Sequence, residues 1–447
     1  MEIRRRRDRN DGGGDWGNDT IPDPRGKAVP RMETLTPHDV WVLASAALVL
    51  VMTPGLALFY GGLVRARSVV NMMLFSISAM GVVGVLWILF GYGMSTFADG
   101  ETGWAGNPAA DLGLIHTDPA EFIGLGFGAT FAMISTALIS GAIADRVGLG
   151  PWVLFAGLWA TLVYFPVAAW VWGGGWIQNL GSALGTADVI DWAGGTAVHI
   201  NAGAAALALA LVAGKRAGFA PGSHRPHSLP LVTIGAALLW FGWIGFNAGA
   251  ADQAGTAGLI LVNTIGAPAA AILGWLAVDR LRGRKPSVVG ATSGAVAGLV
   301  AITPACADLA PVWALLLGLL AGAVCALAIE WKYRLGFDDS LDVVGLHLVA
   351  GVLGTIYLGF FATERGLLLG GDAGLLLVQT ISVLGVLLYS FTVSLLIALG
   401  VRAVTGLRVP ATVEERGIDS AAHGEHAYAL DPEHAAPEPA ALGGVRR

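Results

Sequence analysis

The chain has 447 residues, of which 55% are hydrophobic and only 13% are charged. Soluble domains carry about 25% charged residues, so this composition excludes an ordinary soluble protein and favours one whose surface faces lipid. The net charge of −6, confined to loops and ends, excludes a basic nucleic-acid surface, and 64 glycines suit closely packed membrane helices. Cys306 and Cys325 lie in apolar stretches without the spacing of a disulfide framework or a zinc site, so the sequence indicates no metal and no cofactor.

Residues 1–31 differ from the rest of the chain. Basic residues, Gly, Asp and Asn fill much of this segment, which predicts disorder, and it lacks the apolar core of a signal peptide. Its positive charge also conflicts with the outside location that the topology below gives it. We therefore hypothesise that translation starts at Met32 and that residues 1–31 result from a mis-called start, which N-terminal sequencing of the native protein tests.

Residues 32–404 consist largely of charge-free apolar runs, each long enough to cross a bilayer, which takes about 20 residues. The alternating polarity of barrel strands is absent. The sequence predicts an all-α polytopic membrane protein with about eleven spans, at 41–64, 69–97, 122–144, 149–176, 192–213, 229–250, 254–278, 287–307, 309–329, 343–363 and 373–401.

Basic residues predict the orientation of these spans, because they concentrate in cytoplasmic loops. One set of loops carries nearly all of them: Arg65, Arg67, Arg146, Lys215, Arg216, Arg225, Arg280, Arg282, Arg284, Lys285, Lys332 and Arg334. The other set carries only Arg365, with acids such as Glu101 and Asp111. We expect the N-terminus outside, the C-terminus inside, and residues 405–447 as a polar cytoplasmic tail whose Ala/Pro/Glu-rich end is disordered.

Of nine histidines, only His199 and His347 fall inside predicted spans. Ionisable groups there are costly and mark a pathway or relay, the alternative being a structural histidine bonded to a helix carbonyl. An apparent repeat connects them: Asp191-Trp-Ala-Gly-Gly-Thr-Ala-Val-His ends at His199 in the fifth span, and Asp342-Val-Val-Gly-Leu-His ends at His347 in the tenth. Because an offset of five spans reverses direction, the sequence predicts an inverted 5+5 helix repeat with a site near the midplane.

Two neutral imidazoles in contact can share one proton, and their titration then belongs to the pair. Such a pair can take a proton from a small cation or pass one along. Trp172, at the outer end of the fourth span, offers a ring face that attracts cations, although an interfacial tryptophan is the alternative interpretation. Phe127, Phe131 and Phe246 are ambiguous in the same way, since membrane phenylalanines usually pack or contact lipid.

These residues lie in stretches that resemble the Amt/Mep/Rh ammonium transporters, on the Amt side, from about Thr36 to Tyr428. The matching stretches, in order, are Pro54-Gly-Leu-Ala-Leu-Phe-Tyr-Gly-Gly62, Asp191 through Asn201, Trp243-Ile-Gly-Phe-Asn-Ala-Gly249, Ile302-Thr-Pro-Ala305 and Asp338 through His347.

The resemblance implies a homotrimer in the plasma membrane with one pore in each subunit. By motif match, His199 and His347 are the pore histidines, Phe131 and Phe246 the stacked gate, Trp172 and Phe127 the outer recruitment site, and Asp191 a structural acid near that site. Many relatives place a serine at the recruitment site, where this chain has Ala250. Loss of one hydroxyl acceptor predicts weaker recruitment rather than loss of function.

The tail also resembles the family, at Glu415-Arg-Gly-Ile-Asp419 and His423-Gly-Glu-His-Ala-Tyr428. In relatives this segment packs under the subunits and couples them, and a PII-type regulatory protein often docks on that face. The implied substrates are ammonium and ammonia, with methylammonium as an analogue.

Three other classes of function fit the sequence less well. The alternative to a transporter is an ammonium sensor that signals through its cytoplasmic tail, which the shortness of the tail disfavours. A carbon dioxide channel is disfavoured by Trp172. An enzyme is excluded because the sequence shows no nucleophile–base pair, phosphate loop or metal cluster.

Overall fold

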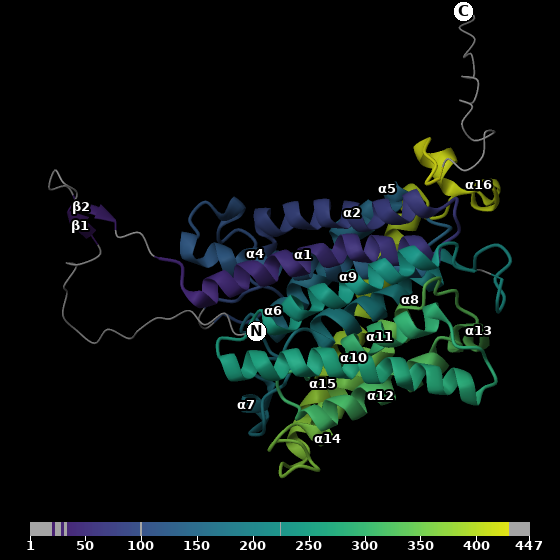
Figure 1. Cartoon of the computed structure of the whole chain (residues 1–447). Coiled ribbons are helices and arrows are strands. Elements are labelled where there is room, and N and C mark those ends of the chain that lie inside the picture. The colour runs from purple at the N-terminus through teal and green to yellow at the C-terminus, as the bar shows by residue number, and fades with distance from the viewer. Residues whose placement is uncertain (1–19, 23–27, 31–33, 99–100, 224, 429–447) are drawn as a thin grey trace, which may run out of the picture.

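The computed structural model describes residues 20–22, 28–30, 34–98, 101–223 and 225–428. Within them, one short antiparallel pair of strands, β1 (Thr20–Pro22) and β2 (Ala28–Pro30), precedes an all-helical body (Figure 1). The α-helices are α1 (Pro37–Leu63), α2 (Val69–Leu86), α3 (Tyr92–Met94), α4 (Phe122–Ile139), α5 (Leu149–Trp159), α6 (Phe165–Val171), α7 (Leu180–Leu184), α8 (Asn201–Ala213), α9 (Leu229–Ala248), α10 (Ala254–Leu281), α11 (Val288–Ile302), α12 (Pro311–Ala328), α13 (Trp331–Leu335), α14 (Val349–Phe361), α15 (Ala373–Thr405) and α16 (Ala411–Arg416).

Shorter turns of 3₁₀- or π-helix continue or connect these helices. They are η1 (Trp87–Gly91), η2 (Leu112–Leu114), η3 (Pro119–Glu121), η4 (Ser140–Ile143), η5 (Ala160–Tyr164), η6 (Gly195–Ile200), η7 (Val344–Leu348) and η8 (Asp419–His423). Four of them, η1, η5, η6 and η7, are π-helical turns within long membrane helices. Such turns are rare and often mark functional sites.

The all-α membrane fold is confirmed. Ten helical segments of the described chain are long and apolar enough to cross a bilayer: Pro37–Leu63, Val69–Met94, Pro119–Ile143, Leu149–Val171, Gly195–Ala213, Leu229–Ala248, Ala254–Leu281, Pro311–Leu335, Val344–Phe361 and Ala373–Thr405. Each coincides with one predicted span. The remaining predicted span, 287–307, holds the apolar helix α11 of only 15 residues, so a count of eleven crossings stays a prediction.

The first and sixth spans, α1 and α9, pack along each other through glycines. A Cβ atom on Gly235 would lie 2.2 Å from the backbone nitrogen of Phe59, and one on Gly62 would lie 2.7 Å from the carbonyl oxygen of Ser228. Only glycine permits these distances, because membrane helices approach closely where side chains are absent. These helices are the first members of the two predicted repeats.

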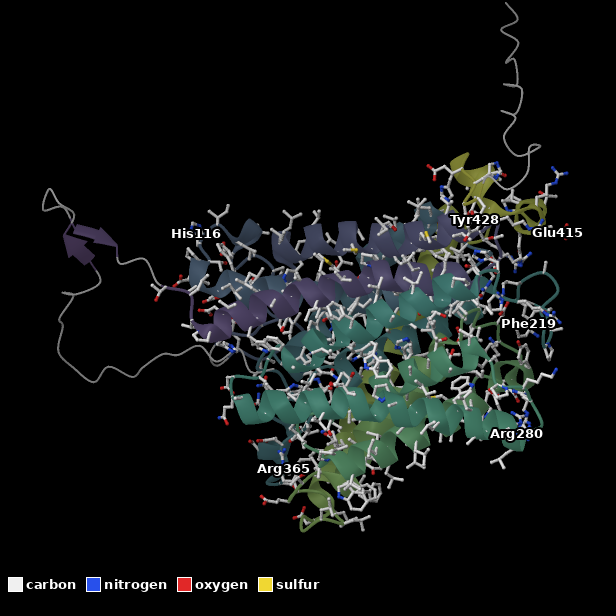
Figure 2. All side chains as sticks on the ribbon, in the orientation of Figure 1. His116, Phe219, Arg280, Arg365, Glu415 and Tyr428 are labelled. Carbon is white, nitrogen blue, oxygen red and sulfur yellow. The ribbon has the colours of Figure 1, made fainter. Side chains whose placement is uncertain are left out.

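The long helices run side by side, and their loops gather at two ends (Figure 1). Figure 2 shows Arg280, Glu415 and Tyr428 at one end and His116 and Arg365 at the other. This separation matches the two predicted sets of loops, while the direction of the molecule in a membrane stays a prediction.

The first part of the tail folds against the basic end. The Glu414 carboxylate accepts hydrogen bonds from the backbone of Ala217 at 2.6 Å and from Arg408, and the Asp419 carboxylate accepts from the first amides of α2, at Val70 and Asn71. Three predictions lie outside the described residues. They are the disorder of residues 1–31, apart from β1 and β2, the start of translation at Met32, and the disorder of the tail from residue 429.

Candidate functional site

The two histidines meet in the interior of the bundle. His199 lies in η6 at the start of the Gly195–Ala213 span and His347 in η7 at the start of the Val344–Phe361 span, and their side chains are almost fully buried. Their Nδ1 atoms are 3.2 Å apart, and the ring planes are inclined by 29°. The side chains that the repeat predicted to meet are therefore in hydrogen-bond contact.

A contact between two Nδ1 atoms fixes how the neutral rings are protonated relative to each other. One Nδ1 must carry the proton and the other must accept it, so the first ring has a bare Nε2 and the second has a protonated Nε2. The pair therefore has one acceptor end and one donor end. The Nε2 atom of His199 is buried and has no hydrogen-bond partner among the described residues.

Glycines four residues after each histidine let the two helices touch. A Cβ atom on Gly203 would lie 2.5 Å from the backbone nitrogen of Leu348, and one on Gly351 would lie 3.1 Å from Cγ1 of Ile200. Each glycine thus faces the residue that follows the histidine of the other helix. The contacts are reciprocal, as two inverted repeats require.

Asp191 caps the helix that carries His199. Its carboxylate accepts hydrogen bonds from the backbone amides of Gly194, Gly195, Thr196 and Ala197, including 3.0 Å from Gly194 and 3.1 Å from Ala197, and from the Thr196 hydroxyl. These groups are the unpaired donors at the start of a helix, where a negative charge is stabilising. Asp191 therefore fixes the turn from which His199 enters the interior.

The corresponding acid of the second repeat is Asp339, which the sequence reasoning missed. Its Oδ2 atom accepts from the backbone amide of Val344, at the start of η7, at 2.7 Å. The apparent sequence repeat paired Asp191 with Asp342 instead. In the structure Asp342 corresponds to Gly194, because each lies five residues before its histidine and each has a left-handed backbone, with φ of 64° and 116°.

Asp339 is buried beside a second carboxylate and one ammonium group. Lys332 donates to the Asp339 carbonyl oxygen at 2.8 Å and to Oδ1 of Asp342 at 2.5 Å. Burial raises the pKa of the Asp339 carboxyl to about 6, and the Lys332 charge opposes that rise. Its Oδ1 atom has no partner among the described residues.

Four aromatic rings lead from one end of the bundle to the histidines. Phe131 and Phe246 are stacked with ring centroids 4.1 Å apart and planes 13° apart. Trp172 stands edge-on to Phe131 at 6.1 Å, and Phe127 packs edge-on to Phe131 at 4.9 Å. On the other side, Phe246 lies 6.2 Å from the His199 ring. The structure thus brings all four predicted aromatic residues into one series of contacts that continues to His199.

Trp172 lies at the end of this series that is farthest from the histidines, and Ala250 was predicted to lie near it. The Trp172 indole N–H donates to the carbonyl oxygen of Asp191 at 2.9 Å, so this N–H is not available to a ligand. Ala250 follows α9 in a turn and is half-buried. The preceding Gly249 packs against Phe127, since a Cβ atom there would lie 2.5 Å from the Phe127 ring. Ala250 is thus close in sequence to the ring contacts but contributes no hydroxyl.

A cavity of about 10 Å³ adjoins the histidines. Phe246, Trp243, His199 and His347 line it, and most of its other lining side chains are aliphatic. One water needs about 10–15 Å³ measured in this way, so the space suits a single molecule of that size. Trp243 is the second residue that the sequence reasoning did not assign: its ring stacks on His199 at 5.5 Å, and its N–H donates to the Thr303 hydroxyl at 2.8 Å.

Among the described residues, no group of three or more His, Cys, Asp or Glu side chains could hold a metal ion. The site is therefore made of rings, two imidazoles and apolar side chains.

Comparison with known proteins gives one consistent result. Residues 40–428 match the family model described as "Ammonium Transporter Family". The chain is 49% identical over 432 residues to a protein of Mycobacterium tuberculosis named "Ammonium transporter", covering 87% of this chain and 89% of the relative. A protein of Bacillus subtilis with the same name is 42% identical over 404 residues, covering 87% and 98%.

Solved structures agree. A structure described as "Sensor Amt Protein" superposes with a TM-score of 0.79 at 28% identity, covering 86% of this chain and 97% of its own. The crystal structure of Saccharomyces cerevisiae Mep2 has a TM-score of 0.73 at 32% identity, covering 84% and 88%.

Proposed function

The chain belongs to the ammonium transporter family, and from that premise we propose that it moves ammonium nitrogen across a membrane through a pore within the single chain, past His199 and His347. Its family and relatives are transporters and not enzymes. Ammonium is the substrate class, with methylammonium as an analogue.

In the proposed path, ammonium first meets the faces of Trp172 and Phe127. A cation over an aromatic face gains about 0.5–2 kcal/mol. With Ala250 in place of a hydroxyl, recruitment depends more on these faces. Asp191 has a structural role, since its carboxylate is occupied by the amides of η6.

Next, the stacked rings of Phe131 and Phe246 act as the gate. Beyond them the lining is apolar, and an ion would lose its hydration without replacement, which costs far more than moving a neutral molecule. We propose that ammonium gives up its proton near this gate and that ammonia continues. The histidine pair then offers ammonia one donor and one acceptor, in a space that suits one small molecule.

The observation that carries the proposal is the Nδ1–Nδ1 contact of His199 and His347 next to the stacked phenylalanines. A structural histidine would bond to a helix carbonyl, whereas each of these rings has the other as its partner.

Reconstitution of the full chain into liposomes tests the proposal. We expect saturable methylammonium uptake, and an ammonium gradient on a supported membrane shows by its current whether the proton crosses too. Either electrical result is compatible with transport, while absence of uptake by a correctly folded protein would overturn it.

We further propose a homotrimer in the plasma membrane, with a PII-type protein as a partner at the basic end. The folded tail supports a docking role, since α16 and η8 are held there by Glu414 and Asp419. Native mass spectrometry of the full chain checks the number of subunits. A sensor function is not favoured, because the curated relatives compared above are named as transporters.

A further inference from the structure

A second cavity, of about 40 Å³, lies beside Trp172 and Phe131. It extends between α4 and the ends of the second and fourth spans, and neither Phe127 nor Ala250 belongs to its lining. The space is sufficient for one ammonium ion together with a water, since one water needs about 10–15 Å³ measured in this way.

Two π-helical turns border this cavity. Trp87 comes from η1 and Tyr164 from η5, and both line it. A π-turn inserts one extra residue into a helix and frequently marks a functional site. Here the two turns belong to different spans, the second and the fourth, and each contributes a residue to the lining of the same cavity.

Two hydroxyl groups that line the cavity, those of Ser95 and Thr96, donate their protons to helix carbonyls. Ser95 donates to the carbonyl oxygen of Gly91 at 2.8 Å, and Thr96 donates to the carbonyl oxygen of Tyr92 at 3.3 Å. A hydroxyl that donates its single proton keeps its oxygen lone pairs as acceptors. Ser95 and Thr96 therefore act as acceptors toward any occupant.

The indoles that line the cavity also have their protons engaged elsewhere. The Trp87 N–H donates to the carbonyl oxygen of Leu125 at 3.1 Å, and the Trp172 N–H donates to that of Asp191 at 2.9 Å. Their contribution to the cavity is therefore the electron-rich ring rather than a donor, which favours a cation.

A carboxylate adjoins this arrangement. The Tyr92 hydroxyl donates to Oε2 of Glu121 at 3.3 Å, and Tyr92 itself lines the cavity. Glu121 therefore places a negative charge one hydrogen bond away from the Tyr92 side chain. A negative charge near an entrance raises the local concentration of cations there.

We propose that this cavity is a second ammonium-binding position, in which Ser95, Thr96 and the faces of Trp87 and Trp172 hold the cation before it reaches Phe131. The inference rests on the proposed function for its substrate class. Ammonium has four N–H donors and no acceptor, and in this mostly apolar lining the ring faces would hold it, with the Ser95 and Thr96 oxygens as the acceptors. Potassium needs a full shell of oxygen ligands to replace its hydration, and two hydroxyl oxygens do not supply one.

This position gives Ala250 a physical context. Ala250 supplies no hydroxyl acceptor, whereas Ser95 and Thr96, which line the cavity with Trp172, carry one each. The same indole then serves both the family's expected recruitment site and the cavity.

The test measures equilibrium binding of methylammonium to the purified full chain by titration calorimetry, and methylammonium uptake in liposomes in parallel. In S95A/T96V we expect the dissociation constant and the apparent KM to rise about tenfold, with the maximal rate unchanged, because hydrogen bonds to a charged group are lost. Thr233→Val is the matched control, since its hydroxyl makes the same helix-carbonyl bond, to Leu229 at 3.0 Å, on an exposed face of α9.

A pair of glycine variants tests the same space without removing a hydroxyl. A Cβ atom on Gly128 would lie 2.9 Å from the Trp87 ring, whereas one on Gly126 of the same helix would meet nothing within 4 Å. We expect Gly128→Ala to weaken methylammonium binding several-fold and Gly126→Ala to leave it unchanged.

The outcomes separate the two proposals. Binding that is as tight in S95A/T96V as in T233V, with Gly128→Ala also unaffected, would overturn the cavity as a site. Binding that depends on these residues in a protein without uptake would keep the site and overturn the transport function. A wild-type chain that binds no methylammonium overturns the inference directly.

Discussion

Asp191 and Asp339 hold equivalent places in the two halves of the chain, each eight residues before a histidine of the buried pair and each accepting hydrogen bonds from the first amides of that histidine's helix. The two acids differ in surroundings. Asp191 is saturated by amides and the Thr196 hydroxyl, whereas Asp339 shares its site with Lys332 and Asp342 and keeps one oxygen without a partner among the described residues. The same local geometry therefore serves a fully hydrogen-bonded cap in one half and, in the other, a cap whose carboxyl pKa is raised by burial.

Under the proposed function, removal of either His199 or His347 is expected to damage transport. His199→Ala or His347→Ala breaks the shared Nδ1 contact and widens a lumen that suits one small molecule. We expect methylammonium uptake to fall at least about tenfold, or potassium to be admitted, since positioned proton-transfer groups contribute 10²–10⁴-fold. Uptake and potassium current in liposomes measure this, with the exposed His116→Ala as control. Both variants behaving like that control would refute the role of the pair.

Replacement of Trp172 should weaken recruitment more than folding. Trp172→Leu removes a cation-attracting face and the N–H bond to Asp191. We expect the apparent KM to rise about three- to thirtyfold with a similar melting temperature, from a loss of about 0.5–2 kcal/mol. Trp176→Leu, at a tryptophan that is 40% exposed, is the control for an interfacial residue. An unaltered KM in Trp172→Leu would mean that Trp172 is an interfacial tryptophan without a role in recruitment.

Restoring a hydroxyl at Ala250 should strengthen recruitment. Ala250→Ser adds one acceptor beside Gly249 and the Phe127 ring. A neutral hydrogen bond contributes about 0.5–1.5 kcal/mol, so the apparent KM is expected to fall about two- to tenfold. Uptake kinetics measure it against Ala110→Ser in an exposed loop. A KM that does not fall would mean that position 250 does not contact the substrate.

Asp339 predicts a pH dependence of stability. Its pKa is raised by burial from 3.8 to about 6, so the folded chain binds a proton that the unfolded chain releases between roughly pH 4 and pH 6. Stability is therefore lost as the pH rises through that window. The charged neighbours are Lys332 and Asp342, and Tyr60 also interacts with the carboxylate.

Asp339→Asn stays neutral and keeps an oxygen for the Val344 amide. We expect the melting temperature of the variant minus that of wild type to increase between pH 4 and pH 7. The corresponding change in the difference of unfolding free energies is about 3 kcal/mol. Thermal unfolding of both proteins across that range measures the difference. A difference in melting temperature between the variant and wild type that stays constant or decreases as the pH rises would contradict the prediction.

Much of the fold could be predicted because membrane spans depend on composition over a long window. The ten long spans follow directly from apolar runs, and α11 departs only because Thr303 and Pro304 end its regular helix early. The meeting of His199 and His347 followed from the odd offset of the repeat. The stacking of Phe131 on Phe246 came from the family resemblance, since spacing alone could not decide it.

Other features escaped the sequence because they depend on backbone geometry. The repeat was paired through Asp342 and not through Asp339, because the sequence does not show which of these residues adopts the left-handed backbone and which caps the helix. A constant spacing of eight residues from acid to histidine was the available signal. Trp243 and the π-turns at Trp87 and Ala160 gave no signal, because a π-turn leaves hydropathy unchanged.

The single proton between the two Nδ1 atoms gives the histidine pair a polarity. When a proton enters at the bare Nε2 of one ring, the Nδ1 proton shifts to the other ring, and that ring releases its Nε2 proton. Afterwards donor and acceptor ends have exchanged, so a second proton cannot follow in the same direction until the rings are reset. A passing ammonia molecule changes neither ring. Under the proposed function, each proton that crosses would therefore reverse the donor and acceptor ends of the His199–His347 pair, and each ammonia molecule would leave them unchanged.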